Sequence, residues 1–130
     1  MRLTLLLATM LTVASPAVAY VPQVREARAW LRERMSDRQF RCLHVLWDKE
    51  SSWRVRARGP LTPWGRARGI PQALPGRKMR SAEHPGWGPK WDDWRTDALV
   101  QVAWGLKHYI RPRYGTACRA LAFQEVNQWY

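Results

Sequence analysis

The sequence predicts a small, mostly α-helical domain that is interrupted by one long irregular segment. Apolar residues recur at helical spacing before residue 51 and after residue 95, with capping residues between the segments. Residues 51–95 instead hold most of the glycines and prolines and five of the nine tryptophans. Such a long irregular stretch inside a compact domain is uncommon and is usually functional. Residues 20–130 suffice for one domain with its own core.

Residues 1–19 have the layout of a secretory signal peptide. Arg2 gives a basic start, residues 3–13 form an apolar core, and residues 17–19 are an A-x-A cleavage site. The apolar run is too short for a spanning helix, so an uncleaved membrane anchor is the less favoured interpretation. We expect cleavage near Ala19 and a secreted protein without a stable membrane anchor.

Two amphipathic helices are expected before residue 51. The first, over about 22–35, belongs to an N-terminal basic helix region (20–36) that precedes the main domain (37–130). Its apolar stripe is Val24, Ala27, Leu31 and Met35, and its basic, solvated face is Arg25, Arg28, Arg32 and Arg34. Ser36 and Asp37 end this helix and cap the next one, which covers about 38–50 and ends at Glu50. The second apolar stripe is Phe40, Leu43, Leu46 and Trp47.

Short hairpin-like or one-turn elements are expected in the irregular segment, with residues 72–79 partly helical. Thr96 is expected to cap a third helix with Asp97 in its first turn. The buried stripe of that helix is Leu99, Val102, Ala103, Leu106, Tyr109 and Ile110. Pro112 should kink or fray its last turn, and Gly115 should end it. Thr116 can then cap a short closing helix.

Cys42 and Cys118 are the two cysteines, and in an oxidising compartment such a pair predicts one disulfide. The bond would close a loop of roughly 75 residues and connect the second helix to the closing helix. We expect no metal site, because His44, His84 and His108 show no paired-ligand spacing with either cysteine. A nucleophilic role for Cys42 is disfavoured because no base lies at a suggestive spacing.

The formal net charge of +12 favours a polyanionic partner. Nucleic acid is one candidate, but export makes an anionic cell-wall polymer the better one, and we expect no nucleic-acid partner. A second interpretation is that the arginine-rich composition reflects nucleotide bias and solubility.

Glu50 is the candidate catalytic acid. A carboxylate at a helix C-terminus meets the negative end of the helix dipole, and Trp47 and Trp53 would desolvate it. Both effects favour the protonated form, which a general acid needs. The competing interpretation is an ordinary solvated glutamate. Residues 69–76 follow with one uncharged amide, Gln72, which could bind a sugar or simply cap a turn.

The tryptophans divide into two groups. Trp47 and Trp104 lie on apolar helix faces and are expected in the core. Trp64, Trp87 and Trp91 lie in irregular chain beside Arg or Lys, where a flat, half-exposed ring can stack on a sugar. Each of these three could equally pack within a cleft.

Several motifs occur together in one order and spacing. They are Phe40-x-Cys42-Leu43, Trp47-x-x-Glu50-Ser51-x-Trp53, Gly69-Ile70-Pro71-Gln72-Ala73-Leu74-Pro75-Gly76-x-Lys78-Met79, Asp93-Trp94-Arg95-Thr96, Gln101-x-x-Trp104-Gly105-Leu106-x-x-Tyr109-Ile110, Arg113-Tyr114-Gly115 and Trp129-Tyr130. With them, residues 40–130 resemble the lysozyme-like lytic transglycosylase domains of secreted bacterial, chiefly actinobacterial, proteins. The resemblance implies a goose-lysozyme or transglycosylase type of helical fold.

The resemblance also implies an activity: cleavage of the β-1,4 bond between N-acetylmuramic acid and N-acetylglucosamine in peptidoglycan, with a 1,6-anhydro product. Glu50 matches the catalytic glutamate, and Ser51 matches a residue that helps to orient it. Gln72 matches a polar residue lining the cleft, and Tyr109 matches a tyrosine that approaches the glutamate, although it could be a core residue alone. We add Trp64 and Trp91 as substrate-binding candidates. No cofactor is implied, and we expect a monomer that binds peptidoglycan glycan strands.

The chain departs from the family pattern in its irregular segment. Residues 59–68 differ from the usual sequence, Arg68 replaces a common tyrosine, and residues 83–90 are longer than usual. These changes leave subsite specificity open. The chain would instead be a hydrolytic muramidase if Asp92 or Asp93 supplied a second carboxyl group. It could also be a catalytically silent wall-binding module or, least favoured, a cationic protein that binds nucleic acid or membranes.

Overall fold

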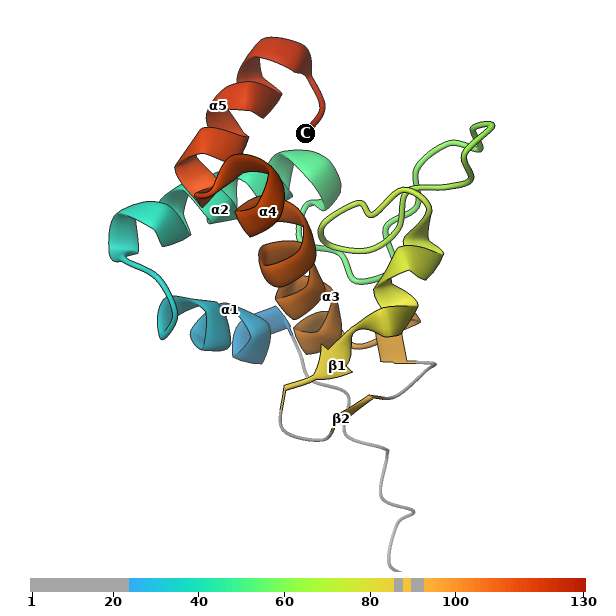
Figure 1. Cartoon of the computed structure of the whole chain (residues 1–130), viewed down its shortest axis with the longest axis horizontal. Helices are drawn as coiled ribbons and strands as arrows, with labels where there is room; N and C mark the ends of the chain where they lie inside the picture. Colours follow the sequence, from blue (N-terminus) through green and yellow to red (C-terminus); the bar gives the residue numbers. More distant parts are fainter. Residues whose placement is uncertain (1–23, 86–87, 90–92) are drawn as a thin grey trace, which may run out of the picture.

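The computed structural model describes residues 24–85, 88–89 and 93–130. The predicted signal peptide and Trp87, Trp91 and Asp92 therefore lie outside the described residues. The described chain is mostly helical, as predicted (Figure 1). None of its helices combines the length and the apolar character that crossing a membrane requires.

The elements follow the predicted order. They are α1 (Val24–Arg32), α2 (Asp37–Ser51), η1 (Gly76–Ser81), β1 (Glu83–His84), β2 (Gly88–Pro89), η2 (Asp93–Arg95), α3 (Ala98–Trp104), η3 (Gly105–Ile110), α4 (Arg111–Tyr114) and α5 (Ala117–Asn127). The two short strands pair antiparallel, with His84 opposite Gly88. The irregular segment before η1 projects from one side of the helices (Figure 1).

The first two helices form through the caps and apolar stripes expected of them. Ser36 has an extended backbone, and its Oγ accepts a hydrogen bond from the N–H of Gln39 at 3.2 Å, which confirms it as the N-cap of α2. α1 packs mainly against α3, and its Ala27 and Leu31 are fully buried in the same core cluster as the apolar stripe of α2. The N-terminal basic helix therefore shares its core with the main domain.

The basic face expected over 22–35 is largely exposed: Arg25, Arg32 and Arg34 are exposed, and Arg28 is half-buried. The guanidinium groups of Arg28, Arg32 and Arg34 each lie over an aromatic ring, at 4.6 Å, 4.6 Å and 3.9 Å from its centroid. The three rings belong to Trp53, Phe40 and Trp30. Cation–π contacts of this kind use the planar cation to cover apolar surface.

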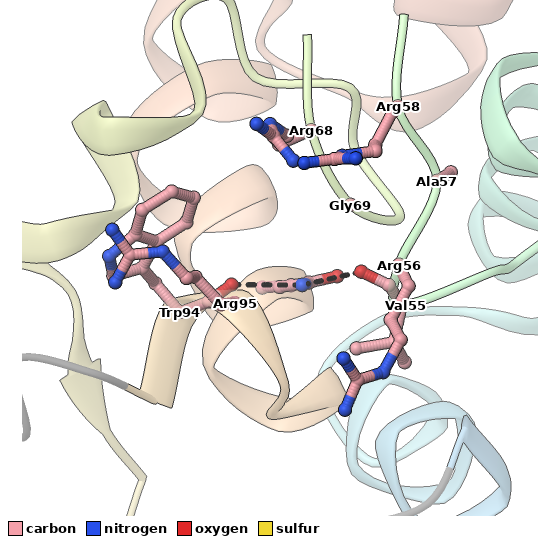
Figure 2. A pocket seen from close by; sticks show the side chains of 9 residues that line it. Val55, Arg56, Ala57, Arg58, Arg68, Gly69, Trp94 and Arg95 are labelled. Atoms are coloured by element: carbon pink, nitrogen blue, oxygen red, sulfur yellow. Dashed lines mark hydrogen bonds between the residues drawn. The ribbon is translucent and has the colours of Figure 1, made fainter. Parts of the chain in front are cut away.

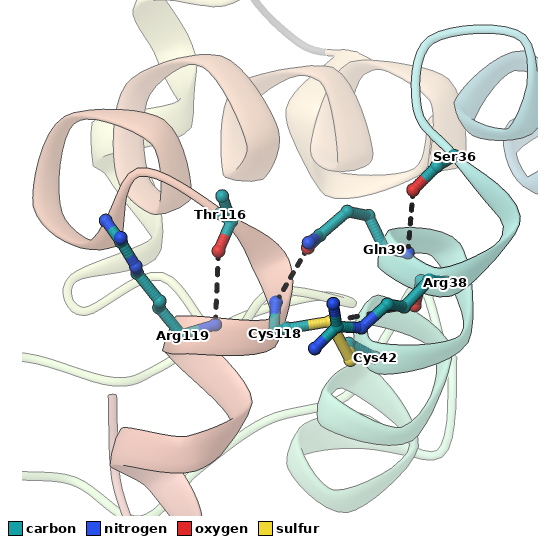
Figure 3. The surroundings of a disulfide bond; sticks show 7 residues. All are labelled: Ser36, Arg38, Gln39, Cys42, Thr116, Cys118 and Arg119. Carbon is teal, nitrogen blue, oxygen red and sulfur yellow. Dashed lines mark hydrogen bonds between the residues drawn. A yellow bond between two sulfur atoms is a disulfide. The ribbon is translucent and has the colours of Figure 1, made fainter.

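The predicted disulfide between Cys42 and Cys118 is present, and it joins α2 to α5 (Figure 3). Beside it, the backbone N–H of Cys118 donates to Oε1 of Gln39 at 2.9 Å. Thr116 caps α5 as predicted, because its Oγ1 accepts from the N–H of Arg119. The second and last helices are thus held together by packing, a hydrogen bond and a covalent bond.

The start of α3 corrects one prediction. Its N-cap is Asp97 and not Thr96, because Oδ1 of Asp97 accepts from the N–H groups of Leu99 (2.9 Å) and Val100 (3.2 Å). A carboxylate in this position satisfies two free helix donors and also meets the positive end of the helix dipole. Oδ2 of Asp97 lies 3.0 Å from Nε2 of buried His84.

The sequence predicts a kinked or frayed last turn at Pro112. The turn does not fray: η3, just before Pro112, is a π-helical turn, and α4 continues the helix to Tyr114. Proline has no N–H and cannot donate to the carbonyl four residues earlier, and a π-helical turn changes which carbonyls need a donor. Gly115, with φ of 77°, ends the helix as predicted.

The irregular segment folds into short hairpin-like turns, as expected. Isolated antiparallel bridges join Arg58 to Arg68 and Arg68 to Ala73. The expectation of partial helix over 72–79 holds only from Gly76 onward, because Gln72 has a φ of 52° and Pro75 is extended.

Candidate active site

Glu50 lies in the last turn of α2 and is half-buried. Burial raises the pKa of its carboxyl group above the usual value of 4.5. Within the described part of the chain, no hydrogen bond or ion pair involves this carboxylate. Glu50 is therefore a carboxyl group that favours its protonated form and is not tied to a protein partner.

The charge of Glu50 affects the pKa of three tyrosines. Desolvation is the main cause of the raised pKa of Tyr109, Tyr114 and Tyr130, and the negative charge of Glu50 raises the pKa of each further. The rings of Tyr109 and Tyr130 meet edge to face at 5.0 Å, and those of Tyr114 and Tyr130 stack at 6.2 Å. The charge of Glu50 thus acts on a cluster of aromatic rings built by α4, the helix before it and Tyr130.

Tyr130 connects this cluster to the two predicted motifs. Its hydroxyl donates to the carbonyl oxygen of Pro71 at 2.6 Å and accepts from Nε1 of Trp47 at 2.8 Å. The hydroxyl of Tyr109 donates to the backbone oxygen of Tyr130 and accepts from Arg113 at 2.8 Å. α2 and the segment 69–76 are therefore fixed relative to each other next to Glu50.

We expect Tyr130→Phe to lower the free energy of unfolding by roughly 2 kcal/mol, because the buried Trp47 N–H and Pro71 carbonyl both lose their partner. Urea unfolding followed by tryptophan fluorescence measures this loss. Ser81→Ala is the control: it also removes a hydroxyl, but at an exposed position, and should change stability by less than about 0.5 kcal/mol. A Tyr130→Phe protein as stable as the wild type would mean that the two hydrogen bonds contribute no net stability.

Ser51 and Gln72 both bond to nearby backbone. The hydroxyl of buried Ser51 donates to the carbonyl of Trp47 at 3.1 Å. Nε2 of Gln72 donates to the carbonyl of Gly69 at 2.9 Å, which is the turn-capping role that the sequence left open beside sugar binding. Each side chain supports an element that carries the candidate site, and neither forms a hydrogen bond to Glu50 in the described structure.

The structure confirms the predicted positions of some tryptophans and does not test others. Trp47 and Trp104 are buried in the core, as expected. Trp64 is 73% exposed in the turn between Thr62 and Gly65, and it borders a cavity of about 720 Å³ with Leu74 and Lys78. Glu50 does not line this cavity. Trp91 lies outside the described residues.

The sequence did not reveal Tyr114, Tyr130 and Arg113 as members of the site. Tyr130 is separated from its partner Trp47 by 83 residues, so no local pattern connects them. The only signals were the occurrences of Arg113-Tyr114-Gly115 and Trp129-Tyr130 among the family motifs. No cluster of three or more metal-ligating side chains is found among the residues that the structure describes.

The chain is thus a mostly helical, disulfide-linked domain with a half-buried glutamate at a helix end. No family model, curated protein or solved structure matches it. A proposal for its function therefore rests on the residues around Glu50.

Proposed function

We propose that the protein is a lytic transglycosylase that cleaves peptidoglycan glycan strands after export to the cell wall, with Glu50 as the general acid and base. The observation that carries the proposal is the environment of Glu50: a half-buried carboxyl group with a raised pKa and no protein partner among the described residues. A general acid works best when its pKa lies near the working pH. The order of motifs around Glu50 adds the resemblance to lysozyme-like transglycosylase domains.

One carboxyl group suffices for this reaction. The Glu50 carboxylic acid donates its proton to the oxygen that joins C1 of N-acetylmuramic acid to O4 of N-acetylglucosamine, and the C1–O4 bond breaks. The 2-acetamido group of the muramic residue stabilises C1. The Glu50 carboxylate then takes the proton of the 6-hydroxyl as O6 bonds to C1, which gives a 1,6-anhydro end and restores the acid. No water is consumed.

The aromatic cluster suits this chemistry. Tyr109, Tyr114 and Tyr130 are close enough for the charge of Glu50 to raise their pKa, so all three remain neutral at neutral pH. Neutral rings beside the carboxyl group exclude water without stabilising its charged form. The same environment that raises the pKa of Glu50 would therefore disfavour attack by water on the sugar.

A muramidase, which hydrolyses the same bond, would normally need a second carboxyl group. The candidates, Asp92 and the side chain of Asp93, lie outside the described residues. The product distinguishes the two enzymes, because hydrolysis leaves a reducing muramic end.

Mass spectrometry of peptidoglycan digested by the mature protein tests the proposal. We expect fragments that end in 1,6-anhydro-N-acetylmuramic acid. Fragments with reducing muramic ends would show that the protein is a muramidase, and Asp92 and Asp93 would then be the candidates for its second carboxyl group. A folded protein that releases no fragments from several peptidoglycan types would overturn both and favour a silent wall-binding module.

A further inference from the structure

A cavity of about 410 Å³, which Glu50 does not line, lies between residues 55–58, residues 68–69, η2 and Gln101 of α3 (Figure 2). Four of its nine lining residues are arginines, and none is acidic; the arginines are Arg56, Arg58, Arg68 and Arg95. Figure 2 shows Arg58 reaching toward Arg68 at one edge, with Arg95 and Arg56 at two other edges. Four arginines from separate segments thus line one space, and Arg58 and Arg68 approach each other at one edge of it.

The walls of this cavity are fixed by hydrogen bonds. Nε2 of Gln101 donates to the carbonyls of Val55 (3.0 Å) and Trp94 (2.9 Å), and its Oε1 accepts from the N–H of Ile70 (2.9 Å). The backbones of Arg58 and Arg68 pair in an antiparallel bridge. The arginines therefore project from a scaffold that is already in place before any ligand binds.

The convergence of these cations is unfavourable without an anion. Arg56, Arg58 and Arg68 form no ion pair with any residue of the described chain. Desolvation, and then the positive charges of Arg58, Arg66 and Arg95, lower the pKa of Arg68. Arg58 and Arg68 line the shared space, whereas Arg95 also lies over the ring of Trp94. A bound anion would remove their mutual repulsion.

We propose that this arginine cavity binds the phosphate groups of a polyol-phosphate polymer. A phosphate is tetrahedral and can accept guanidinium forks from several directions at once, whereas a planar carboxylate commonly pairs with one fork. A second cavity of about 310 Å³ shares Arg68 and Arg95 and adds Arg66 and Arg77, so cations continue beyond the first cavity. A chain with repeated phosphates fits this arrangement better than a single ion does.

Nucleic acid also carries repeated phosphates, but the cavity does not suit its bases. Trp94 is the one aromatic side chain among its lining residues. It is only 5% exposed, and the guanidinium group of Arg95 lies over its ring at 4.4 Å. Single-stranded nucleic acid is normally bound through aromatic faces on which its bases stack. A non-aromatic backbone such as poly(glycerol phosphate) needs no such face.

The arginine cavity contains none of the residues around Glu50, so its ligand does not depend on the proposed function. The test titrates the full mature chain with poly(glycerol phosphate) by calorimetry. The matched variants are Arg56→Gln/Arg58→Gln, with both side chains exposed at the cavity, and Arg25→Gln/Arg41→Gln, with both exposed on helices elsewhere. Each pair removes two positive charges. We expect about tenfold weaker binding in the cavity variant and less than about twofold in the control.

A third variant tests the geometry. Arg68→Lys keeps the charge but loses the planar fork, and it should also weaken binding severalfold. If both double variants lost the same affinity for poly(glycerol phosphate), or if Arg68→Lys bound as tightly as the wild type, binding would depend on net charge alone. Either result would overturn the proposal. The choice of ligand would be overturned if polyglutamate or single-stranded DNA bound to the cavity as tightly as poly(glycerol phosphate). It would also be overturned if poly(glycerol phosphate) did not bind.

The two proposals can fail separately. Glu50→Gln should bind poly(glycerol phosphate) like the wild type, and the Arg56→Gln/Arg58→Gln protein should still cleave peptidoglycan stripped of phosphate polymers. Polymer binding without any glycan cleavage would overturn the proposed function alone. Glycan cleavage without polymer binding would overturn the cavity proposal alone.

Discussion

Replacing Glu50 with glutamine is expected to slow the release of glycan fragments from peptidoglycan by about 10²–10⁴-fold. The amide keeps the size and shape of the side chain but can neither donate the proton to the glycosidic oxygen nor accept it from the 6-hydroxyl. Initial rates of fragment release measure the effect. Glu125→Gln is the matched control, because it makes the same change at an exposed position on α5 and should retain full activity.

The same substitution should stabilise the fold at neutral pH. Burial raises the pKa of Glu50, so between pH 4.5 and the raised value the folded state binds more protons than the unfolded state. The wild type therefore loses stability as pH rises through this range, and Glu50→Gln does not. Thermal unfolding should show a higher midpoint for Glu50→Gln than for the wild type at pH 7, and the difference should vanish below pH 4.5.

Two results would contradict this role of Glu50. A Glu50→Gln protein that cleaves at the wild-type rate would exclude Glu50 as the acid. An inactive variant that is less stable than the wild type at pH 7 would show that the carboxylate makes favourable contacts, and that its activity loss reflects a disturbed fold. Activity of the wild type should fall as pH rises through the raised pKa, because the acid must be protonated.

Local signals in the sequence were sufficient for most of the fold. Ser36, Thr116 and Gly115 mark helix boundaries through hydrogen bonds and backbone conformations that involve only their neighbours. The N-cap of α3 was misplaced by one residue because Thr96 and Asp97 are both good capping residues. Pro112 indicated an irregular last turn, but not that the irregularity is a π-helical turn, which propensity does not predict.

The candidate sites were less predictable, because their residues come from distant parts of the chain. The arginine cavity needs Gln101 to bond to Val55, 46 residues away, and no periodic pattern connects such positions. Charge alone indicated a polyanionic partner without showing where it would bind. Glu50 was the exception, since its helix end and neighbouring tryptophans are local features.

Removal of the disulfide is expected to cost about 4 kcal/mol of stability. Cys42 and Cys118 are 76 positions apart, and the bond restricts the unfolded chain by closing that long loop. This is a large share of the roughly 5–15 kcal/mol by which a typical domain is stable. Denaturant unfolding of Cys42→Ala/Cys118→Ala should show a much lower midpoint, and the reduced wild type should behave similarly.

The disulfide should matter far less for activity at temperatures where the variant remains folded. The contacts around it do not need the covalent bond: α2 and α5 still pack together, and Gln39 still accepts from the N–H of Cys118. Glu50 lies eight residues after Cys42 on the same helix. The hydrogen bonds that join Trp47 to Tyr130 and Tyr130 to Pro71 fix that end of the helix. Fragment release by the double variant, measured in the cold, should therefore stay within about twofold of the wild type. A large loss of activity in protein that circular dichroism shows to be folded would mean that the bond itself positions α2, and that the hydrogen bonds of Tyr130 are not sufficient to hold Glu50 in place.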